Sequence, residues 1–183
     1  MPTVFAALFL LLVSQRILEM ALSTRNRRWA LACGGIERGD RFFPVVVAVH
    51  SLFFVSLLLE WRHRSQGWNT GWPIWLGLVL AAQLLRLWSI RSLGPRWNTR
   101  IIVIPGSKPV MDGPYRFIRH PNYLAVIVEM VAVPVLCGAF ITAAIFTVAN
   151  ALILARRIPE EEKALEEAGG TLLENVPRFL PRF

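Results

Sequence analysis

Cysteine and acidic residues are scarce in this 183-residue sequence. Its two cysteines, Cys33 and Cys137, stand in no CxxC or Cys/His ligand spacing, so the sequence predicts neither a disulfide framework nor a zinc site. The sequence contains no Walker loop and no GxGxxG, HExxH or nucleophile-elbow motif. We therefore expect chemistry that uses neither a Rossmann cofactor site nor a protein-bound metal.

Apolar residues and positive charge are abundant instead. Hydrophobic residues make up 55% of the chain, and 20 Lys and Arg stand against 12 Asp and Glu, for a net charge of +8. Such a chain either binds nucleic acid or carries its charge beside membrane spans, and the distribution of the charge decides between them. Here the basic residues crowd the connections between long apolar runs, which is typical of an integral membrane protein and argues against a nucleic-acid partner.

The apolar runs predict an all-α membrane protein with about five transmembrane helices. Runs over 4–22, 43–59 and 72–90 approach the roughly 20 residues that cross a bilayer core. The stretch 123–155 is too long for one upright helix, and the Pro and Gly of 134–138 break it near its middle, so we interpret it as a helical hairpin. The first run lacks the basic n-region of a signal peptide, and we interpret it as a retained span.

The basic residues also predict an orientation. With five spans, 16 of the 20 basic residues fall on one side of the membrane, and only Arg62 and Arg64 fall on the other, while Arg16 and Arg86 lie within spans. The positive-inside rule then places the N-terminus outside and the C-terminus in the cytoplasm.

Two cytoplasmic segments are long enough to have structure of their own. The loop 92–120 is rich in Gly, Pro and Arg and contains a β-like run over 101–104. The segment 160–168 predicts an amphipathic C-terminal helix that starts after a break at Pro159. We divide the chain into an N-terminal three-span region, 1–91, and a core, 92–183, that contains the loop, the hairpin and this helix.

The densest cluster of reactive side chains is the run Gly-Pro-Tyr-Arg-Phe-Ile-Arg-His-Pro-Asn-Tyr over 113–123, where the loop enters the fourth span. Pro121 suits the first helical turn, which places His120 at the cap beside free backbone N–H groups. With Arg119 adjacent, this helix end favours a carboxylate or phosphate ligand. The alternative is a capped, basic membrane entrance without a ligand, which explains the full combination of residues less well.

Two polar residues within apolar spans have alternative interpretations. Glu129 shares a helical face with Asn122 and lies about 10 Å into the apolar layer. A carboxylate at that depth needs a pocket or a cation, so it either belongs to a site or pairs with Arg16 or Arg86. We interpret His50, in the second span, as a hydrogen-bonded structural histidine rather than a ligand.

Arg157 and Glu161 follow at the end of the last span. Charges at this position either satisfy the helix ends or form the second wall of a site whose first wall is the His120 entrance.

Taken together, these residues resemble the isoprenylcysteine carboxyl methyltransferase superfamily. The resemblance covers about residues 90–183. It rests on Leu93-Gly94 with Trp97, Gly-Pro-Tyr-Arg at 113–116, Arg-His-Pro-Asn-Tyr at 119–123, Glu129, and Arg157 with Glu161-Glu162. The N-terminal half, with Arg-Ile-Leu-Glu at 16–19, is more similar to a bacterial branch associated with type III polyketide synthases. The resemblance implies a membrane-embedded O-methyltransferase of the bacterial inner membrane that uses S-adenosylmethionine on a lipophilic acceptor, with 92–183 as the methyltransferase core.

From the positions that match the family motifs, we form a hypothesis for the role of each residue. Arg157 would orient the anionic acceptor oxygen, Glu161 would fix Arg157, and Glu129 would stabilise a polar or cationic partner. Arg119 and His120 would bind the cofactor carboxylate. The full set of cofactor-binding residues that the resemblance implies is Gly113, Tyr115, Arg119, His120, Pro121 and Tyr123. The tail departs from the family pattern at Leu172-Leu173, where an aromatic pair is usual, although the ending from Pro177 to Pro181 is kept.

The acceptor and the reaction class have open alternatives. The acceptor is either an alkylpyrone- or alkylresorcinol-type hydroxyl or an isoprenylcysteine-type carboxylate. An NADPH-dependent membrane reductase of the steroid reductase type has a similar Arg-His-Pro-Asn-Tyr run, but its tyrosine is soon followed by Gly-Glu, where this chain has Leu124-Ala125. A third interpretation, a non-enzymatic scaffold or transporter, would treat the polar positions as packing.

Overall fold

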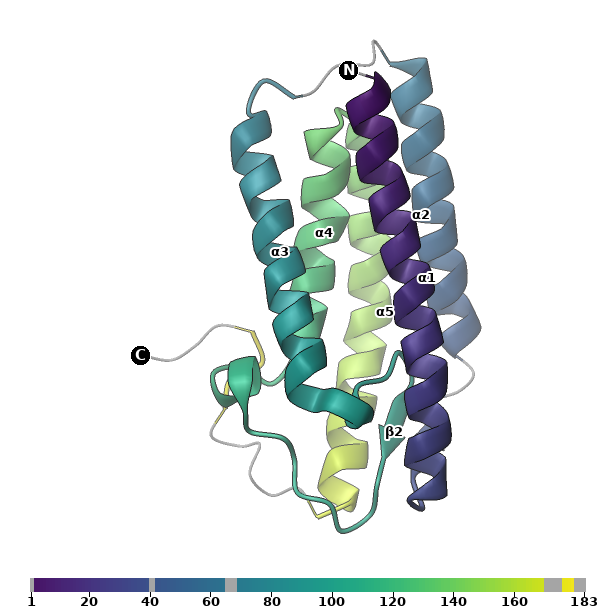
Figure 1. The fold of residues 1–183 in the computed structure, drawn as a ribbon, viewed down its shortest axis with the longest axis vertical. Coiled ribbons are helices and arrows are strands. Elements are labelled where there is room, and N and C mark those ends of the chain that lie inside the picture. The colour runs from purple at the N-terminus through teal and green to yellow at the C-terminus, as the bar shows by residue number, and fades with distance from the viewer. Residues whose placement is uncertain (1, 40–41, 65–68, 170–175, 180–183) are drawn as a thin grey trace.

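The computed structural model describes residues 2–39, 42–64, 69–169 and 176–179. Within these ranges, five α-helices run along a common axis (Figure 1). The helices are α1 (Pro2–Ala32), α2 (Phe43–His63), α3 (Trp72–Leu93), α4 (Pro121–Leu136) and α5 (Phe140–Glu167). Short elements gather at the end of the bundle opposite Pro2, which we call the loop end: β1 (Ile36–Arg38), β2 (Ile101–Val103), and the 3₁₀ turns η2 (Gly94–Arg96) and η3 (Gly113–Arg116).

The helices have the length and surface of membrane spans. Four of them, α1, α2, α3 and α5, are long and apolar enough to cross a bilayer. Large apolar side chains such as Leu18, Ile74 and Leu152 are exposed on the outside of the bundle, where lipid rather than water is their favourable neighbour. The prediction of an all-α integral membrane protein is therefore confirmed.

The predicted hairpin over 123–155 is formed by α4 and α5. The chain reverses at Gly138, whose φ of 72° lies in the left-handed region that favours glycine. The backbone N–H of Ala139 donates to the carbonyl of Pro134 at 2.7 Å and closes the turn. With 16 residues, α4 is the shortest of the described helices, and it packs against both α3 and α5.

The first helix is longer than the apolar pattern predicts. Instead of ending at residue 22, α1 continues to Ala32, so the arginines that follow the span are helical. The extension is held by polar contacts that hydropathy does not reveal. Ser23 Oγ lies 2.9 Å from Asn98 Oδ1 and accepts from the backbone N–H of Thr99 at 3.0 Å, and Asn26 Nδ2 donates to the carbonyl of Trp97 at 2.8 Å.

The predicted break at Pro159 is wrong. The segment after it is helical, as expected, but it is the continuation of α5, which runs through Pro159 to Glu167. Tertiary packing explains the continuity, because Ala164 of this extension packs in a small apolar cluster with Ile101 and Val103 of β2. The β-like run over 101–104 is confirmed as β2, which pairs antiparallel with β1, a strand that the sequence did not predict.

The apolar core fills the half of the bundle nearer Pro2. Phe53 of α2, Val79 of α3, Val133 of α4 and Phe146 of α5 belong to one buried cluster. Phe5 of α1 joins it and stacks on Trp61, with ring centroids 3.8 Å apart. The half nearer the loop end holds the buried charged side chains of α1, α3 and α4 and the cavities described below.

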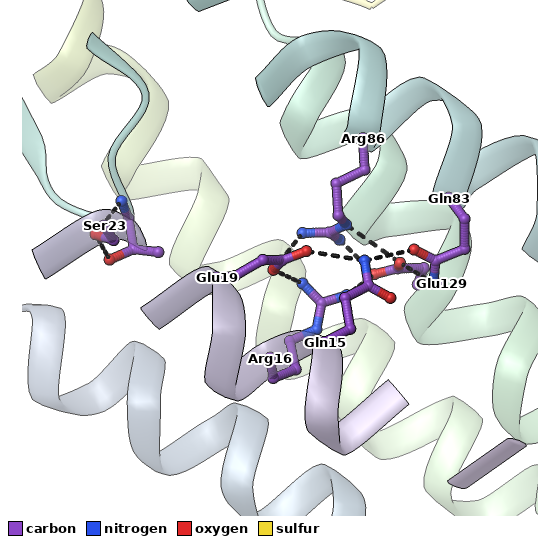
Figure 2. A network of polar contacts seen from close by, with 8 residues as sticks. Gln15, Arg16, Glu19, Ser23, Gln83, Arg86 and Glu129 are labelled. Atoms are coloured by element: carbon purple, nitrogen blue, oxygen red, sulfur yellow. Dashed lines mark hydrogen bonds and ion pairs between the residues drawn. The ribbon is translucent and has the colours of Figure 1, made fainter. Parts of the chain in front are cut away.

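A group of charged residues ties α1 to α3 and α4 inside the apolar layer (Figure 2). We call Arg16, Glu19, Arg86 and Glu129 the ion cluster. The carboxylate of Glu129 accepts from Arg16 Nη2 at 2.6 Å, from Gln83 Nε2 at 2.8 Å and from Arg86 Nη2. The ion-pair interpretation of Glu129 is confirmed, and both candidate arginines contact it.

Glu19 forms the second half of the ion cluster. It accepts from Arg16 Nη1 at 2.5 Å and from Gln15 Nε2 at 2.9 Å, and Arg86 Nη1 lies 3.5 Å away. Two arginines and two glutamates leave no net charge, which matters because an unpaired charge in the bilayer core costs about 3 kcal/mol on insertion scales. The ion cluster therefore fixes the position of α1 against α3 and α4.

Replacement of Glu129 by alanine is expected to destabilise the protein by about 3–5 kcal/mol, because it leaves a buried cation unpaired. Thermal unfolding in detergent measures the loss. The double variant Arg86→Met with Glu129→Met removes one pair of opposite charges and keeps the pair of Arg16 and Glu19, so it should lose less stability than Glu129→Ala. Equal losses would contradict the charge-pairing role.

Candidate active site

A cavity at the loop end brings most of the predicted site residues together. It is bounded by the loop between α3 and α4, by the start of α4 and by the second half of α5. Six of the predicted residues line it: Tyr115, Arg119, His120, Tyr123, Arg157 and Glu161. Glu129 does not line it, because its carboxylate is taken up by the ion cluster. We call this space the loop cavity.

Gly113 and Pro121 shape the backbone of the loop cavity rather than line it. Gly113 has a φ of 59°, and a Cβ atom at this position would lie 2.0 Å from Ser92 Oγ, so only glycine lets η3 approach α3 this closely. Pro121 occupies the first turn of α4, with His120 at the N-cap, as the sequence predicts.

Two backbone N–H groups just before α4 donate to the C-terminal segment. The N–H of Arg119 donates to the carbonyl of Pro177 at 2.9 Å, and that of His120 donates to the carbonyl of Arg178 at 3.2 Å. The Nε of Arg119 also donates to the carbonyl of Val176. A C-terminal segment, 176–179, is thus bound across the start of α4.

Glu162, to which the sequence analysis gave no role, holds this segment in place. Its carboxylate is buried and accepts from Arg178 at 2.6 and 3.0 Å. It also contacts His120 Nε2 at 3.1 Å and Arg119 Nη1 at 3.3 Å. The Glu-Glu pair is a sequence signal for this residue, but the partners come from two distant segments. Residues 172 and 173, where the tail departs from the family pattern, lie outside the described residues.

Tyr123 and Arg157 meet at the centre of the site. The Tyr123 hydroxyl accepts from Arg157 Nε at 2.9 Å and donates to Glu161. Arg157 Nη2 donates to the carbonyl of Thr99, and its guanidinium lies 5.7 Å from the centroid of the Tyr123 ring. Among the described residues, Glu161 therefore reaches Arg157 through the Tyr123 hydroxyl, and not by the direct contact that the sequence suggested.

Tyr115 supplies a neutral hydroxyl to the loop cavity. Burial, and then the negative charge of Glu161, raise the pKa of the Tyr115 phenol well above its ordinary value, although a hydrogen bond with Ser89 acts against the shift. Tyr115 therefore stays protonated across the physiological pH range and acts as a hydrogen-bonding group rather than a base.

A second, apolar cavity of about 480 Å³ lies deeper in the bundle, between α1, α2, α4 and α5. Its size is typical of small-molecule sites. Ile17, Val47 and Phe54 contribute to its walls, and Arg16 of the ion cluster borders it. We call it the bundle cavity.

The two cavities share one wall. Five residues line both of them: Trp97, Asn98, Asn122, Tyr123 and Arg157. Two buried polar atoms in this wall, Trp97 Nε1 and Asn122 Oδ1, have no hydrogen-bond partner within the described part of the chain. Because buried polar atoms are nearly always paired in native proteins, these two atoms make the shared wall a candidate ligand contact. Hydropathy patterns gave no signal for either residue.

Comparison with known proteins identifies a family for this chain. The family model for the isoprenylcysteine carboxyl methyltransferase (ICMT) family matches residues 75–167, which include α4, all of α5 and the loop that forms the loop cavity. No solved structure matches the chain significantly.

Two bacterial relatives match over most of their length. A Bacillus subtilis protein, "Uncharacterized protein YpbQ", is 38% identical over 163 residues, which cover 89% of this chain and 97% of the relative. An "Uncharacterized protein" of Haemophilus influenzae is 27% identical over 158 residues, which cover 86% and 92%. From the family match and the near-complete coverage of these relatives, the chain belongs to the isoprenylcysteine carboxyl methyltransferase family of membrane-embedded methyltransferases.

Proposed function

We propose that the protein is an S-adenosylmethionine-dependent O-methyltransferase that acts on a lipophilic acceptor. The observation that carries this proposal is the shared wall of the two cavities. A polar cofactor fits the charged loop cavity, an apolar acceptor fits the bundle cavity, and Tyr123 and Arg157 border both. Two reactants of opposite polarity would therefore meet at one place.

The residues of the loop cavity fit the cofactor. Trp97 Nε1 is an unpaired donor suited to a carboxylate or hydroxyl oxygen, and Asn122 Oδ1 is an unpaired acceptor suited to an ammonium group. Apolar side chains such as Leu93 and Leu165 offer contacts for a purine ring. When bound, S-adenosylmethionine supplies an electrophilic methyl group.

The cofactor-binding residues that the resemblance implies have two roles in this proposal. Tyr115 and Tyr123 shape the walls of the loop cavity, and Gly113 and Pro121 set the backbone around it. Arg119 and His120 border the cofactor site and also hold the C-terminal segment through Glu162, so the binding of that segment and of the cofactor would be coupled. We assign Glu129 to positioning helices.

Arg157 would orient the acceptor oxygen. Its Nε and Nη2 groups are held by Tyr123 and Thr99, so the guanidinium has a fixed position in the shared wall. Methyl transfer to an anionic oxygen needs little acid or base assistance, and its rate depends on alignment and on exclusion of water. The apolar bundle cavity provides that exclusion. The acceptor class is an alkylresorcinol- or alkylpyrone-type hydroxyl or an isoprenylcysteine-type carboxylate.

We infer that the loop end faces the cytoplasm of a bacterial inner membrane, with the N-terminus outside, since the basic residues gather at this end.

Cys33 is exposed at the loop end, whereas Cys137 is buried. A membrane-impermeant maleimide should therefore label Cys33 in permeabilised but not in intact spheroplasts. A Thr3→Cys variant is the control for the other end of α1 and should be labelled in intact spheroplasts. Labelling of Cys33 in intact spheroplasts would show the reverse orientation.

The cofactor assignment predicts selective binding by the purified protein in detergent. Isothermal titration calorimetry should detect binding of S-adenosylhomocysteine and no binding of NADPH. Trp97→Phe keeps an aromatic side chain and removes the N–H that has no partner among the described residues, so it should weaken S-adenosylhomocysteine binding by about tenfold. NADPH binding would support the reductase alternative, and binding of neither compound would support a scaffold or transporter.

The role of Arg157 predicts a defect in transfer rather than in cofactor binding. Arg157→Lys keeps the charge but loses the forked contacts to Tyr123 and Thr99. Transfer of labelled methyl groups to 5-pentadecylresorcinol or N-acetyl-S-farnesylcysteine should fall about ten- to a hundredfold, with S-adenosylhomocysteine affinity nearly unchanged. Arg156→Lys changes the exposed neighbour and serves as the control. Equal effects of the two variants would contradict the role of Arg157.

A further inference from the structure

The bundle cavity has polar groups that methyl transfer at Arg157 does not use. His50 of α2 and Asn150 of α5 both line it. Neither residue lines the loop cavity, so neither is positioned to hold the cofactor. His50 has hydrogen-bonding capacity that the described part of the chain leaves unused.

His50 has one ring nitrogen occupied and one available. Its Nδ1 lies 2.8 Å from the carbonyl oxygen of Val46, one turn earlier in α2. Because a carbonyl oxygen only accepts, Nδ1 carries the proton of this hydrogen bond, and Nε2 of a neutral ring then has a free lone pair. The expected structural hydrogen bond of His50 is thus present, and it fixes Nε2 as an acceptor.

The surroundings of His50 favour the neutral ring. The ion cluster borders the same cavity through Arg16, Glu19 and Arg86, and its two arginines are matched by its two glutamates. No carboxylate of the ion cluster is left over to pair with an imidazolium. In an apolar layer an unpaired extra charge is unfavourable, so the cavity presents a neutral acceptor at His50.

Asn150 is a second polar group that lines the bundle cavity. Only 3% of its surface is exposed. It lies seven residues before Arg157, about 10 Å along α5, and so deeper in the apolar layer. An amide in apolar surroundings is stabilised by a polar partner, so Asn150 offers a contact for a polar group of a ligand.

We propose that the bundle cavity selects a lipophilic acceptor with a hydroxyl group in addition to the methylated oxygen, and that this hydroxyl donates to His50 Nε2 in the cavity that Asn150 also lines. The inference rests on the proposed function and narrows its acceptor class. A purely hydrocarbon prenyl chain would leave His50 Nε2 without a partner, whereas a long-chain diphenol would supply one. Sites built around a polar contact discriminate against analogues that lack it.

Displacement of tritiated 5-pentadecylresorcinol from the detergent-purified protein tests the proposal. Unlabelled 5-pentadecylresorcinol should compete more strongly than 3-pentadecylphenol, which has one hydroxyl fewer, by about three- to twentyfold, the range of one hydrogen bond within a membrane protein. His50→Leu should abolish this preference, and His50→Gln, which keeps an acceptor, should retain part of it. His63→Leu changes an exposed histidine outside the cavity and should retain all of it.

Equal competition by the two probes, a preference that survives His50→Leu, or no binding of the labelled probe would each overturn the proposal. S-Adenosylhomocysteine affinity, measured on the same samples, shows that the His50→Leu protein is folded. The same measurement distinguishes failure of the acceptor proposal from failure of the proposed methyl transfer. Cofactor binding without a hydroxyl preference would refute the acceptor proposal alone, whereas a hydroxyl preference without cofactor binding would refute methyl transfer and leave the ligand site standing.

Discussion

The pairing of charges inside the apolar layer is the constraint on which the rest of the site depends. Each guanidinium and carboxylate of the ion cluster needs its partner at hydrogen-bonding distance, so α1 has one favourable register against α3 and α4. Apolar contacts in a bilayer provide no such selection, since lipid tails are as favourable a neighbour as Leu or Val. The polar residues of the bundle therefore select one register of the helices, whereas the apolar residues are compatible with several.

The position of α1 then determines the position of the reactive groups. Ser23 and Asn26 of α1 hold the loop from Trp97 to Thr99, and the carbonyl of Thr99 in turn holds Arg157. Residues from the first and last helices thus meet through a loop between them. This linkage explains why the N-terminal region, which contributes few side chains to the loop cavity, still matters for its geometry.

Hydropathy and local motifs predicted the spans, the hairpin and most of the residues that line the loop cavity, because these features are local in sequence. The length of α1 and the continuity of α5 at Pro159 were not predictable in this way, since tertiary contacts stabilise both. The motif identified Glu161 but not the role of Glu162, whose partner Arg178 comes from the tail. Unpaired atoms such as Trp97 Nε1 depend on the whole fold and have no sequence signature.

The short α4 sets the depth at which the chemistry takes place. At 16 residues it spans about 24 Å, less than the roughly 30 Å of a bilayer core. Its far end is level with the start of α3, where the backbone N–H of Asn69 donates to the carbonyl of Leu136. If the Leu136 end lies at one membrane surface, the shortfall of about 6 Å falls at the His120 end and places the loop cavity below the other surface. Under the proposed function, a lipid acceptor would then stay in its leaflet throughout turnover, and the polar cofactor would enter from the loop end.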